Sequence, residues 1–334
     1  MACQGLAGEK FLKTVLFPET HDGEMLAAEF GYDPWLVERF LHYVPRPVDF
    51  LKKMDSAHSR YLRVNTLKTS SEALERRLTD KGFKLGRTAL ADVFSVQAGS
   101  ISPGATTEYM LGLYYLQDLS SCIAVEALDV SKESCKAALD IAAAPGGKTS
   151  YIAQKMNNSG YIIALEPNSR RARSMAFNLA RLGVANTCVT LLDGLAAGKL
   201  GRVFDRVLLD APCSCEGVIA KDPSRKTSHT PGDVDYCSAL QQKLIESAVS
   251  AVKPGGLLVY STCSFAPEEN EAVVQHAIDS CDFLKVEPFE LGSEGLLEFG
   301  GHKFSKSLQG TRRFYPHIDD TTGFFIARLR HTGS

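Results

Sequence analysis

The feature of this sequence that most limits its possible folds is the alternation of apolar, β-rich runs with amphipathic helical segments. The alternation begins near Leu116 and continues toward the end of the chain. We expect strands at 137–142, 161–165, 188–192, 204–209, 256–261 and 322–328, and helices at 119–128, 148–156, 168–182, 236–252 and 267–280. Such alternation produces a twisted, mostly parallel sheet with helices on both faces. The sequence therefore predicts a doubly wound α/β domain over residues 113–334.

Two shorter segments precede this domain. Residues 1–57 have helical patterns, and residues 58–112 read as a small α+β unit that resembles an RNA-recognition module. Within that unit, the stretch from Tyr61 to Asn65 alternates like a strand. Thr69 and Glu72 have the spacing of a capping box and predict that a helix begins there.

Composition and cysteine usage indicate a cytoplasmic protein. The 334 residues are 44% hydrophobic and 23% charged, as in an ordinary soluble protein of about two domains. We find no apolar run of bilayer length, and Glu9 and Lys10 interrupt any signal-peptide pattern in Met1–Phe17. Nine irregularly spaced cysteines favour reduced thiols over a disulfide framework. We expect a monomer with no membrane partner.

Basic residues gather in three sets although the formal net charge is only −2. The span from Arg46 to Arg87 holds eleven basic and five acidic residues. Two smaller basic sets follow: Lys221, Arg225 and Lys226, and then Lys303, Lys306, Arg312 and Arg313. Each set could be an ordinary solvated surface. Three of them in a nearly neutral chain favour a polyanionic partner.

Two cysteines directly follow apolar strands. Cys213 comes after the run Val207–Asp210, and Cys263 comes after Leu257–Ser261. Ligands bind at the carboxyl ends of strands in open α/β sheets, so both thiols and Asp210 could share one crevice. A thiol there suits nucleophilic attack, whereas most cysteines are only structural. Cys215 could suggest zinc, but no second close pair supports it, and we expect no metal.

A glycine-rich turn marks a candidate cofactor loop. The segment Ala138–Thr149 reads as a strand, a turn and a helix start, which lets a ligand approach backbone N–H groups. Gly147-Lys148-Thr149 also matches the end of a nucleotide-phosphate loop. Ala142 stands where that motif requires its first glycine, so the match is incomplete. Glu166 ends the next strand, where an acid can bind two ribose hydroxyls.

With these motifs in hand, the chain resembles the Sun-domain family of RNA cytosine-5 methyltransferases, and most closely the compact archaeal-type members that act on tRNA. The resemblance runs from about residue 60 to the end, through several motifs in the family's order. They are Arg63-Val64-Asn65, Tyr115-x-Gln117-Asp118-Leu119-Ser120-Ser121, Ala143–Thr149, Asp210-Ala211-Pro212-Cys213-Ser214, Ser261-Thr262-Cys263-Ser264, Pro267-Glu268-Glu269-Asn270-Glu271, Arg313–His317 and Gly323-Phe324-Phe325.

The resemblance implies a class I methyltransferase fold, S-adenosylmethionine as methyl donor and methylation of carbon 5 of cytosine in RNA. It assigns the nucleophile to Cys263 and the product-releasing thiol to Cys213, with Asp210 beside them. The residues alone do not separate these roles, because DNA cytosine methyltransferases use a Pro-Cys nucleophile like Pro212-Cys213. The implied cofactor residues are Ala142, Ala143, Ala144, Pro145, Gly146, Gly147, Lys148, Glu166, Arg171, Asp193 and Asp210.

Two positions depart from the family's pattern, which usually has cysteine at Ala142 and glycine at Cys215. The substrate expected from the resemblance is tRNA. The same chemistry on rRNA is the alternative, followed by a noncatalytic RNA-binding assembly factor.

Overall fold

The computed structural model describes residues 12–56 and 59–333. The chain divides into two compact units. Unit 1 comprises Met1–His58, Pro212–Lys243 and Ser261–Ala327, and unit 2 comprises Ser59–Ala211, Leu244–Tyr260 and Arg328–Ser334. The expectations about a signal peptide and about the first part of the N-terminal helical segment lie largely outside the described residues.

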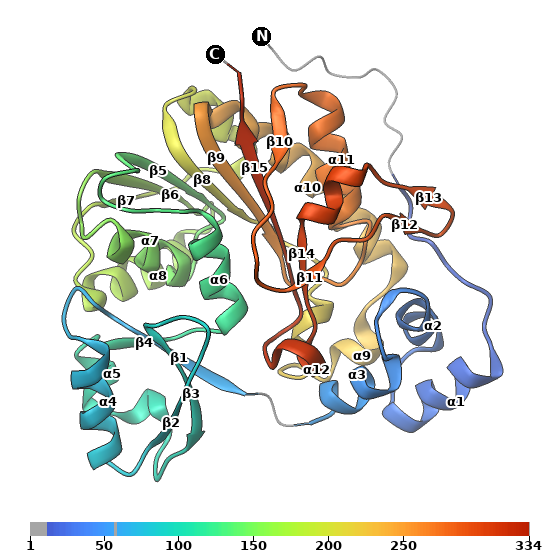
Figure 1. Ribbon diagram of the computed structural model, residues 1–334, viewed down its shortest axis with the longest axis horizontal. Coiled ribbons are helices and arrows are strands. Elements are labelled where there is room, and N and C mark those ends of the chain that lie inside the picture. The colour runs from blue at the N-terminus through green and yellow to red at the C-terminus, as the bar shows by residue number, and fades with distance from the viewer. Residues whose placement is uncertain (1–11, 57–58, 334) are drawn as a thin grey trace. The chain divides into compact units, whose positions relative to one another are not determined.

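The main sheet of unit 2 is parallel where β5 pairs with β6 and β8, and where β6 pairs with β7. Its strand order is β9-β8-β5-β6-β7. The strands are β5 (Ala137–Ile141), β6 (Tyr161–Leu165), β7 (Thr187–Thr190), β8 (Phe204–Asp210) and β9 (Val252–Thr262), the last of which ends in unit 1. The helices are α6 (Leu119–Ala127), α7 (Gly147–Lys155) and α8 (Ser169–Leu182), with a 3-10 segment η2 (Gly194–Leu200). The predicted α/β class is confirmed, and Figure 1 shows α7 and α8 beside β5–β7.

Strands β5 and β8 are buried almost throughout, as expected of central strands in a parallel sheet. Leu139, Ile141 and Val207 are among their side chains that are 0% exposed. Because both faces of such a strand are covered, the strand must end where polar or turn-forming residues begin. This is why Ala142 and Asp210, at the carboxyl ends of β5 and β8, open onto a pocket.

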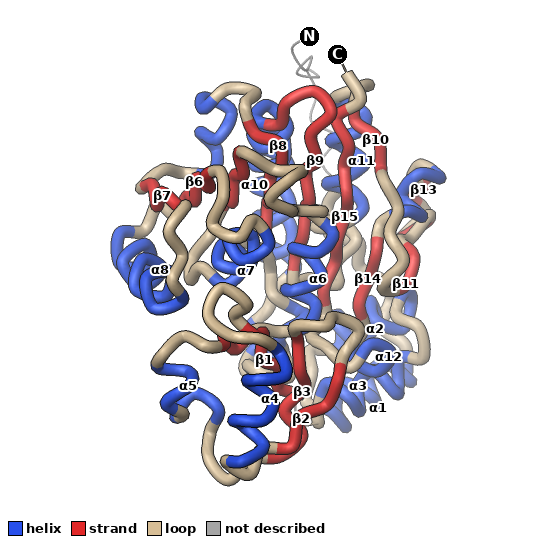
Figure 2. Tube along the Cα trace, turned by 60° about the vertical axis from the view of Figure 1, so that its left-hand side comes forward, coloured by secondary structure: helices blue, strands red, loops and turns tan. Residues whose placement is uncertain are grey.

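A second, antiparallel sheet of unit 2 has the order β2-β3-β1-β4. Figure 2 labels β1, β2 and β3 of this sheet. Its elements are β1 (Arg60–Val64), α4 (Ser71–Asp80), β2 (Lys84–Arg87), β3 (Val93–Ala98), η1 (Pro103–Ala105), α5 (Thr107–Met110) and β4 (Tyr114–Leu116). Leu62, Leu74, Leu78 and Phe94 form its core. The predicted capping box is wrong in its register, because Ser70, and not Thr69, is the N-cap of α4 and accepts a bond from the Ala73 amide at 3.2 Å.

Unit 1 contains most of the remaining elements. They are α1 (His21–Phe30), α2 (Pro34–Tyr43), α3 (Pro47–Met54), η3 (Glu216–Val218), α9 (Arg225–Ser228), α10 (Pro231–Ala251), α11 (Glu271–Ser280), β10 (Leu284–Val286), β11 (Ser293–Glu294), β12 (Glu298–Phe299), β13 (His302–Lys303), η4 (Lys306–Gly310), β14 (Arg312–Phe314), α12 (Pro316–Asp319) and β15 (Phe324–His331). Along the chain, α10 passes from unit 1 into unit 2, and so does β15. Phe40, Phe50, Phe265 and Tyr315 pack in the aromatic core of unit 1.

No helix among the described residues has both the length and the apolar character needed to cross a bilayer. Cysteines 122, 135, 188, 213, 215, 237 and 263 are free thiols, as expected. Cys281 differs from that expectation because it is disulfide-bonded.

Candidate functional site

The turn between β5 and α7 has the backbone of a close-approach loop. Ala142 has φ +61° and Gly146 has φ +95°, and the Ala144–Pro145 peptide bond is cis. A side chain on Gly147 would put its Cβ 3.0 Å from the Tyr115 ring. Positive φ costs little for glycine but is strained for alanine. The loop is therefore held in a conformation that brings its backbone to the surface of a pocket.

That pocket, within unit 2, has a volume of about 210 Å³. Its lining includes seven of the residues predicted from the sequence: Ala142, Ala143, Ala144, Pro145, Gly147, Lys148 and Asp210. The other lining residues are Tyr115, Leu116, Gln117, Asp118, Ser121 and Asp140. Sequence reasoning gave these six no site role. Five of them lie within the Tyr115–Ser121 motif, so the motif itself was the signal that could have found them.

Two carboxylates of the pocket differ in their surroundings. Asp210 forms an ion pair with Lys148, with 2.7 Å between Oδ2 and Nζ. Asp140 is 1% exposed and accepts a bond from the Thr149 hydroxyl at 2.5 Å, while its Oδ1 has no hydrogen-bond partner. Burial raises the pKa of Asp140 to about 7. The pocket thus offers one paired acid and one acid with a free acceptor atom.

Gly146, Glu166, Arg171 and Asp193 are not among the lining residues. Gly146 is the N-cap of α7. Glu166 is buried, and its Oε2 lies 3.3 Å from an Arg171 guanidinium nitrogen without forming a hydrogen bond. Arg171 also donates to the Ala144 carbonyl at 3.1 Å, so this pair supports the loop. Asp193 is exposed and caps η2 by accepting from the Leu195 amide at 2.9 Å.

Arg63 braces the loop from the antiparallel sheet. Its guanidinium donates to the Gly147 carbonyl at 2.7 Å, to Gln117 Oε1 at 2.8 Å and to Ser150 Oγ at 2.8 Å. It also lies over the Tyr151 ring, 4.6 Å from the centroid. Arg63 is 1% exposed, so it is not available to a polyanion as the basic set implied. Burial lowers the pKa of Arg63. Its two terminal nitrogens donate to the three acceptors in the fixed geometry of the planar guanidinium, while Nε is buried without a hydrogen-bond partner.

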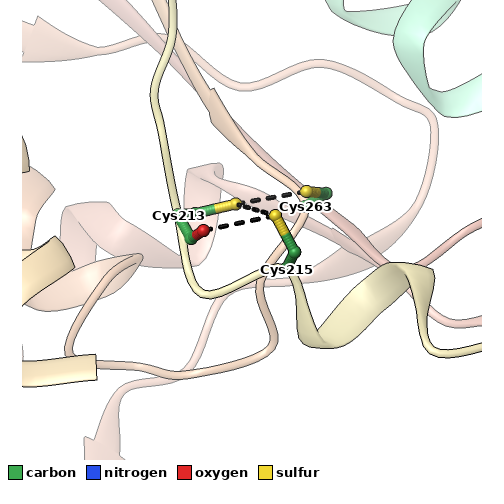
Figure 3. A group of neighbouring side chains, drawn as sticks. All are labelled: Cys213, Cys215 and Cys263. Atoms are coloured by element: carbon green, nitrogen blue, oxygen red, sulfur yellow. Dashed lines mark hydrogen bonds between the residues drawn. The ribbon is translucent and has the colours of Figure 1, made fainter. Parts of the chain in front are cut away.

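In unit 1, the predicted thiols of Cys213 and Cys263 lie together. Their Sγ atoms are 3.1 Å apart, and the Sγ of Cys215 is 3.8 Å from that of Cys213 (Figure 3). Cys263 follows β9, and the other two cysteines lie in the loop after β8. The Gly217 amide donates to the Cys263 carbonyl at 2.8 Å, which joins the two segments. All three cysteines are partly exposed.

The electrostatics of this cluster separate its thiols. Hydrogen bonds with Cys215 and Cys263, together with burial, raise the pKa of Cys213 well above its usual range. The pKa of Cys215 is lowered by hydrogen bonds from Cys213 and Cys263 and by the charges of Arg225 and His229. Negative charge is therefore favoured on the cluster, while Cys213 keeps its proton and acts as a donor.

One buried carboxylate, Glu269, clamps the two thiol segments together. Its Oε2 accepts from the Ser214 amide at 2.9 Å and from Gln241 Nε2 at 2.8 Å. Its Oε1 accepts from the Ser264 hydroxyl at 2.6 Å and also from the Ser214 hydroxyl. Ser214 follows Cys213 and Ser264 follows Cys263. Burial and the nearby charge of Glu216 raise the pKa of Glu269 to about 7, although the serine hydrogen bonds oppose the shift.

The residues next to Glu269 in the sequence also have side chains that are held by hydrogen bonds. Glu268 makes a two-bond pair with Arg39, at 2.9 and 2.7 Å, and Glu271 makes one with Arg313. Asn270 accepts from the Thr262 hydroxyl at 2.6 Å. The helix expected from 267 starts only at Glu271, because these side chains and Pro267 form a turn instead. Sequence reasoning quoted this acidic motif without assigning it a role in the site.

Known proteins are similar to this chain over most of its length. The sequence model of the family described as "16S rRNA methyltransferase RsmB/F" matches residues 125–330. The 28S rRNA (cytosine-C(5))-methyltransferase of Mus musculus is 41% identical over 315 residues, covering 91% of this chain and 39% of the mouse protein. Ribosomal RNA small subunit methyltransferase F of Aliivibrio fischeri is 38% identical over 281 residues, covering 82% and 58%. The chain thus spans roughly two fifths to three fifths of these relatives.

Two solved structures are also similar. A methyltransferase homolog from Pyrococcus horikoshii superposes with a TM-score of 0.84 at 38% identity, covering 93% of this chain and 99% of that one. NSun6 from Pyrococcus horikoshii, solved with SFG, superposes with a TM-score of 0.76 at 26% identity, covering 93% and 98%.

Proposed function

Since this chain belongs to the RsmB/F (Sun-domain) family of RNA methyltransferases, we propose that it methylates carbon 5 of cytosine in RNA through a covalent thiol adduct. The observation that carries the proposal is the 3.1 Å separation of the Cys213 and Cys263 sulfurs. Thiols so close together suit a reaction that needs one sulfur to form a bond and a second group to help break it.

S-adenosylmethionine fits the pocket of unit 2 and would supply the methyl group. The side chains of Ala142, Ala143 and Ala144 form an apolar wall that an apolar part of the cofactor could contact. Asp140 Oδ1 is a buried acceptor without a hydrogen-bond partner, so it could accept a hydrogen bond from the cofactor. Glu166 Oε2 is a second such acceptor, at the end of the neighbouring strand, where an acid suits ribose hydroxyls. SFG, an analogue of S-adenosylmethionine, occupies the NSun6 structure.

The chemistry requires nucleophilic activation of the base. Carbon 5 of cytosine is too weak a nucleophile by itself. When a thiolate adds to carbon 6, the ring becomes enamine-like and carbon 5 can attack the methyl group. Asp210 would accept a hydrogen bond from the exocyclic amine and stabilise the ring as charge develops. Once carbon 5 carries the methyl group, a base removes its proton and the carbon–sulfur bond breaks, which restores the aromatic ring.

We assign the bond to carbon 6 to Cys263 and the release step to Cys213. The raised pKa of Cys213 keeps this thiol protonated before attack, so it can donate a hydrogen bond to the Cys263 sulfur 3.1 Å away. The hydrogen bond with Cys215 is the first cause of the raised pKa of Cys213, and the contact with Cys263 is the second. When the Cys263 sulfur is bonded to carbon, it carries no negative charge, and that second cause is weakened. Cys213 then becomes more acidic, and its thiolate can take the proton from carbon 5.

The substrate class we favour is rRNA. Both relatives described above act, by their names, on rRNA, and so do those of Homo sapiens and Schizosaccharomyces pombe. None of these four relatives is named as a tRNA methyltransferase, so they do not support the tRNA preference expected from the archaeal-type resemblance. The exposed side chains of Arg76, Arg77, Lys81 and Lys84, on and just after α4, would contact phosphates.

The decisive test uses the purified chain with S-adenosylmethionine and two RNA pools, rRNA and tRNA from cells that lack the protein. Bisulfite sequencing should show new 5-methylcytosine at defined positions of the rRNA pool. Methylation confined to the tRNA pool would show that the substrate is tRNA and contradict the preference for rRNA. Binding of both RNA pools without any methylation would favour the noncatalytic assembly factor.

A further inference from the structure

The third thiol of the cluster, Cys215, neither attacks the base nor takes its proton in the proposed reaction. It is at the N-cap of η3 with φ +64°, in the left-handed region that favours glycine. Its Sγ lies 3.2 Å from the Cys213 carbonyl oxygen, on the side of the other two sulfurs (Figure 3). A strained backbone position thus holds one more sulfur beside the pair.

The three sulfurs form a small triangle, since all lie within 4.8 Å of one another. A thiophilic d¹⁰ cation such as Zn²⁺ binds sulfur at about 2.3 Å, so tetrahedral ligands lie about 3.8 Å apart. The Cys213–Cys215 separation is already 3.8 Å. The Cys213–Cys263 separation of 3.1 Å would have to open by about 0.7 Å. Small side-chain rotations supply such a change.

The surrounding structure holds the triangle in place and leaves it reachable. Glu269 and the Gly217–Cys263 hydrogen bond join the two segments that carry the sulfurs. The three cysteines are neither fully buried nor fully exposed, so a hydrated cation can enter. Preorganised ligands lose little conformational entropy on binding, which favours affinity.

We propose that Cys213, Cys215 and Cys263 bind one thiophilic divalent cation, represented by Zn²⁺, and that its binding reversibly blocks methylation. The second half rests on the proposed function, because two of these sulfurs are the thiols that the reaction uses. Three protein sulfurs leave the fourth tetrahedral position to solvent. The proposal departs from the sequence-based expectation of no metal, which looked for a second close pair of ligands in the sequence and did not count Cys263 as a third ligand.

The binding test uses the full chain in a non-thiol reductant, titrated with Zn²⁺ against a chromophoric chelator. Wild type should bind one ion at this site, and Cys215→Gly should weaken that binding at least about tenfold, since even indirect ligand partners contribute 10–100-fold. Glycine suits φ +64°, so this variant should fold. The matched control is Cys188→Ser, which removes the exposed thiol of β7 and should leave the affinity unchanged.

Cd²⁺ gives an independent reading, because its thiolate charge-transfer absorption grows with the number of sulfur ligands. A weaker band in Cys215→Gly than in wild type supports the metal site. An unchanged band, or an equal Zn²⁺ affinity in wild type and Cys215→Gly, overturns it. These measurements need no methylation, so they stand even if the proposed function fails.

The inhibition test compares methylation by wild type and Cys215→Gly. Zn²⁺ should stop the wild type, a chelator should restore it, and the variant should resist the same Zn²⁺ concentration. Inhibition that a reductant reverses and a chelator does not would overturn the metal proposal in favour of a disulfide.

Discussion

The sulfur atoms of Cys213 and Cys263 lie 3.1 Å apart although the two residues are 50 positions apart in the sequence. Two strand ends and the Glu269 clamp bring them together. The distance is that of a hydrogen bond in which either sulfur can be the donor. One sulfur can therefore control the protonation state of the other during a reaction.

Replacing each thiol in turn should separate their roles. Cys213→Ala should form the RNA–protein bond and then fail to release it, so a denaturation-resistant complex accumulates with S-adenosylmethionine and RNA. Each protein molecule should then methylate at most one cytosine. Labelled RNA on a denaturing gel measures the complex.

Cys263→Ala should abolish both methylation and the complex, and adding it to Cys213→Ala should remove the trapped species. Cys188→Ala, which changes the exposed thiol of β7, should behave as wild type. If Cys263→Ala traps RNA and Cys213→Ala does not, the two roles are reversed.

Arg63 does not line the pocket, but its hydrogen bonds to the loop should strengthen the binding of S-adenosylmethionine. Arg63→Lys keeps the charge but loses the planar fork that reaches Gly147, Gln117 and Ser150. Buried acceptors left without donors cost about 1–3 kcal/mol. We expect S-adenosylmethionine to bind about tenfold more weakly, as measured by calorimetry.

The matched control is Arg76→Lys, at an exposed arginine of α4. It should leave cofactor affinity unchanged. Equal affinity in wild type and Arg63→Lys would show that the loop keeps its conformation without this brace.

Glu269 should make the stability of the protein depend on pH. Burial and the Glu216 charge raise its pKa from the ordinary 4.5 to about 7 in the folded state. Between these values the folded protein holds a proton that the unfolded chain has released. Stability from this group is therefore complete below pH 4.5 and is lost as the pH rises through about 7.

Denaturant unfolding of wild type and Glu269→Gln across this range should reveal the difference. The free energy of unfolding of wild type should fall relative to the variant by up to about 3 kcal/mol between pH 4.5 and 7. Glu24→Gln, an exposed position on α1, should change stability by less than about 0.5 kcal/mol. Parallel pH profiles for wild type and Glu269→Gln would contradict the shifted pKa.

The order of strands and helices in the catalytic region could be predicted from sequence because burial leaves a local pattern. Central strands such as β5 and β8 are continuous apolar runs, and α10 ends at Ala251, just before the Lys253-Pro254-Gly255-Gly256 stop. The start of α4 was misplaced by one residue because Thr69 and Ser70 are both good caps. Local chemistry alone does not choose between two such neighbours.

The sequence by itself determined the α/β class, the glycine-rich loop and the two strand-end thiols, since each depends on neighbouring residues and on the periodicity of buried side chains. Only the tertiary structure decided which distant groups share a site. It set Arg63 against the Gly147 carbonyl, Glu269 between Ser214 and Ser264, and Cys215 beside the reactive pair. Hydrogen bonds and thiol contacts act over a few ångströms in space, and residues far apart in the sequence come within that range only when the chain folds.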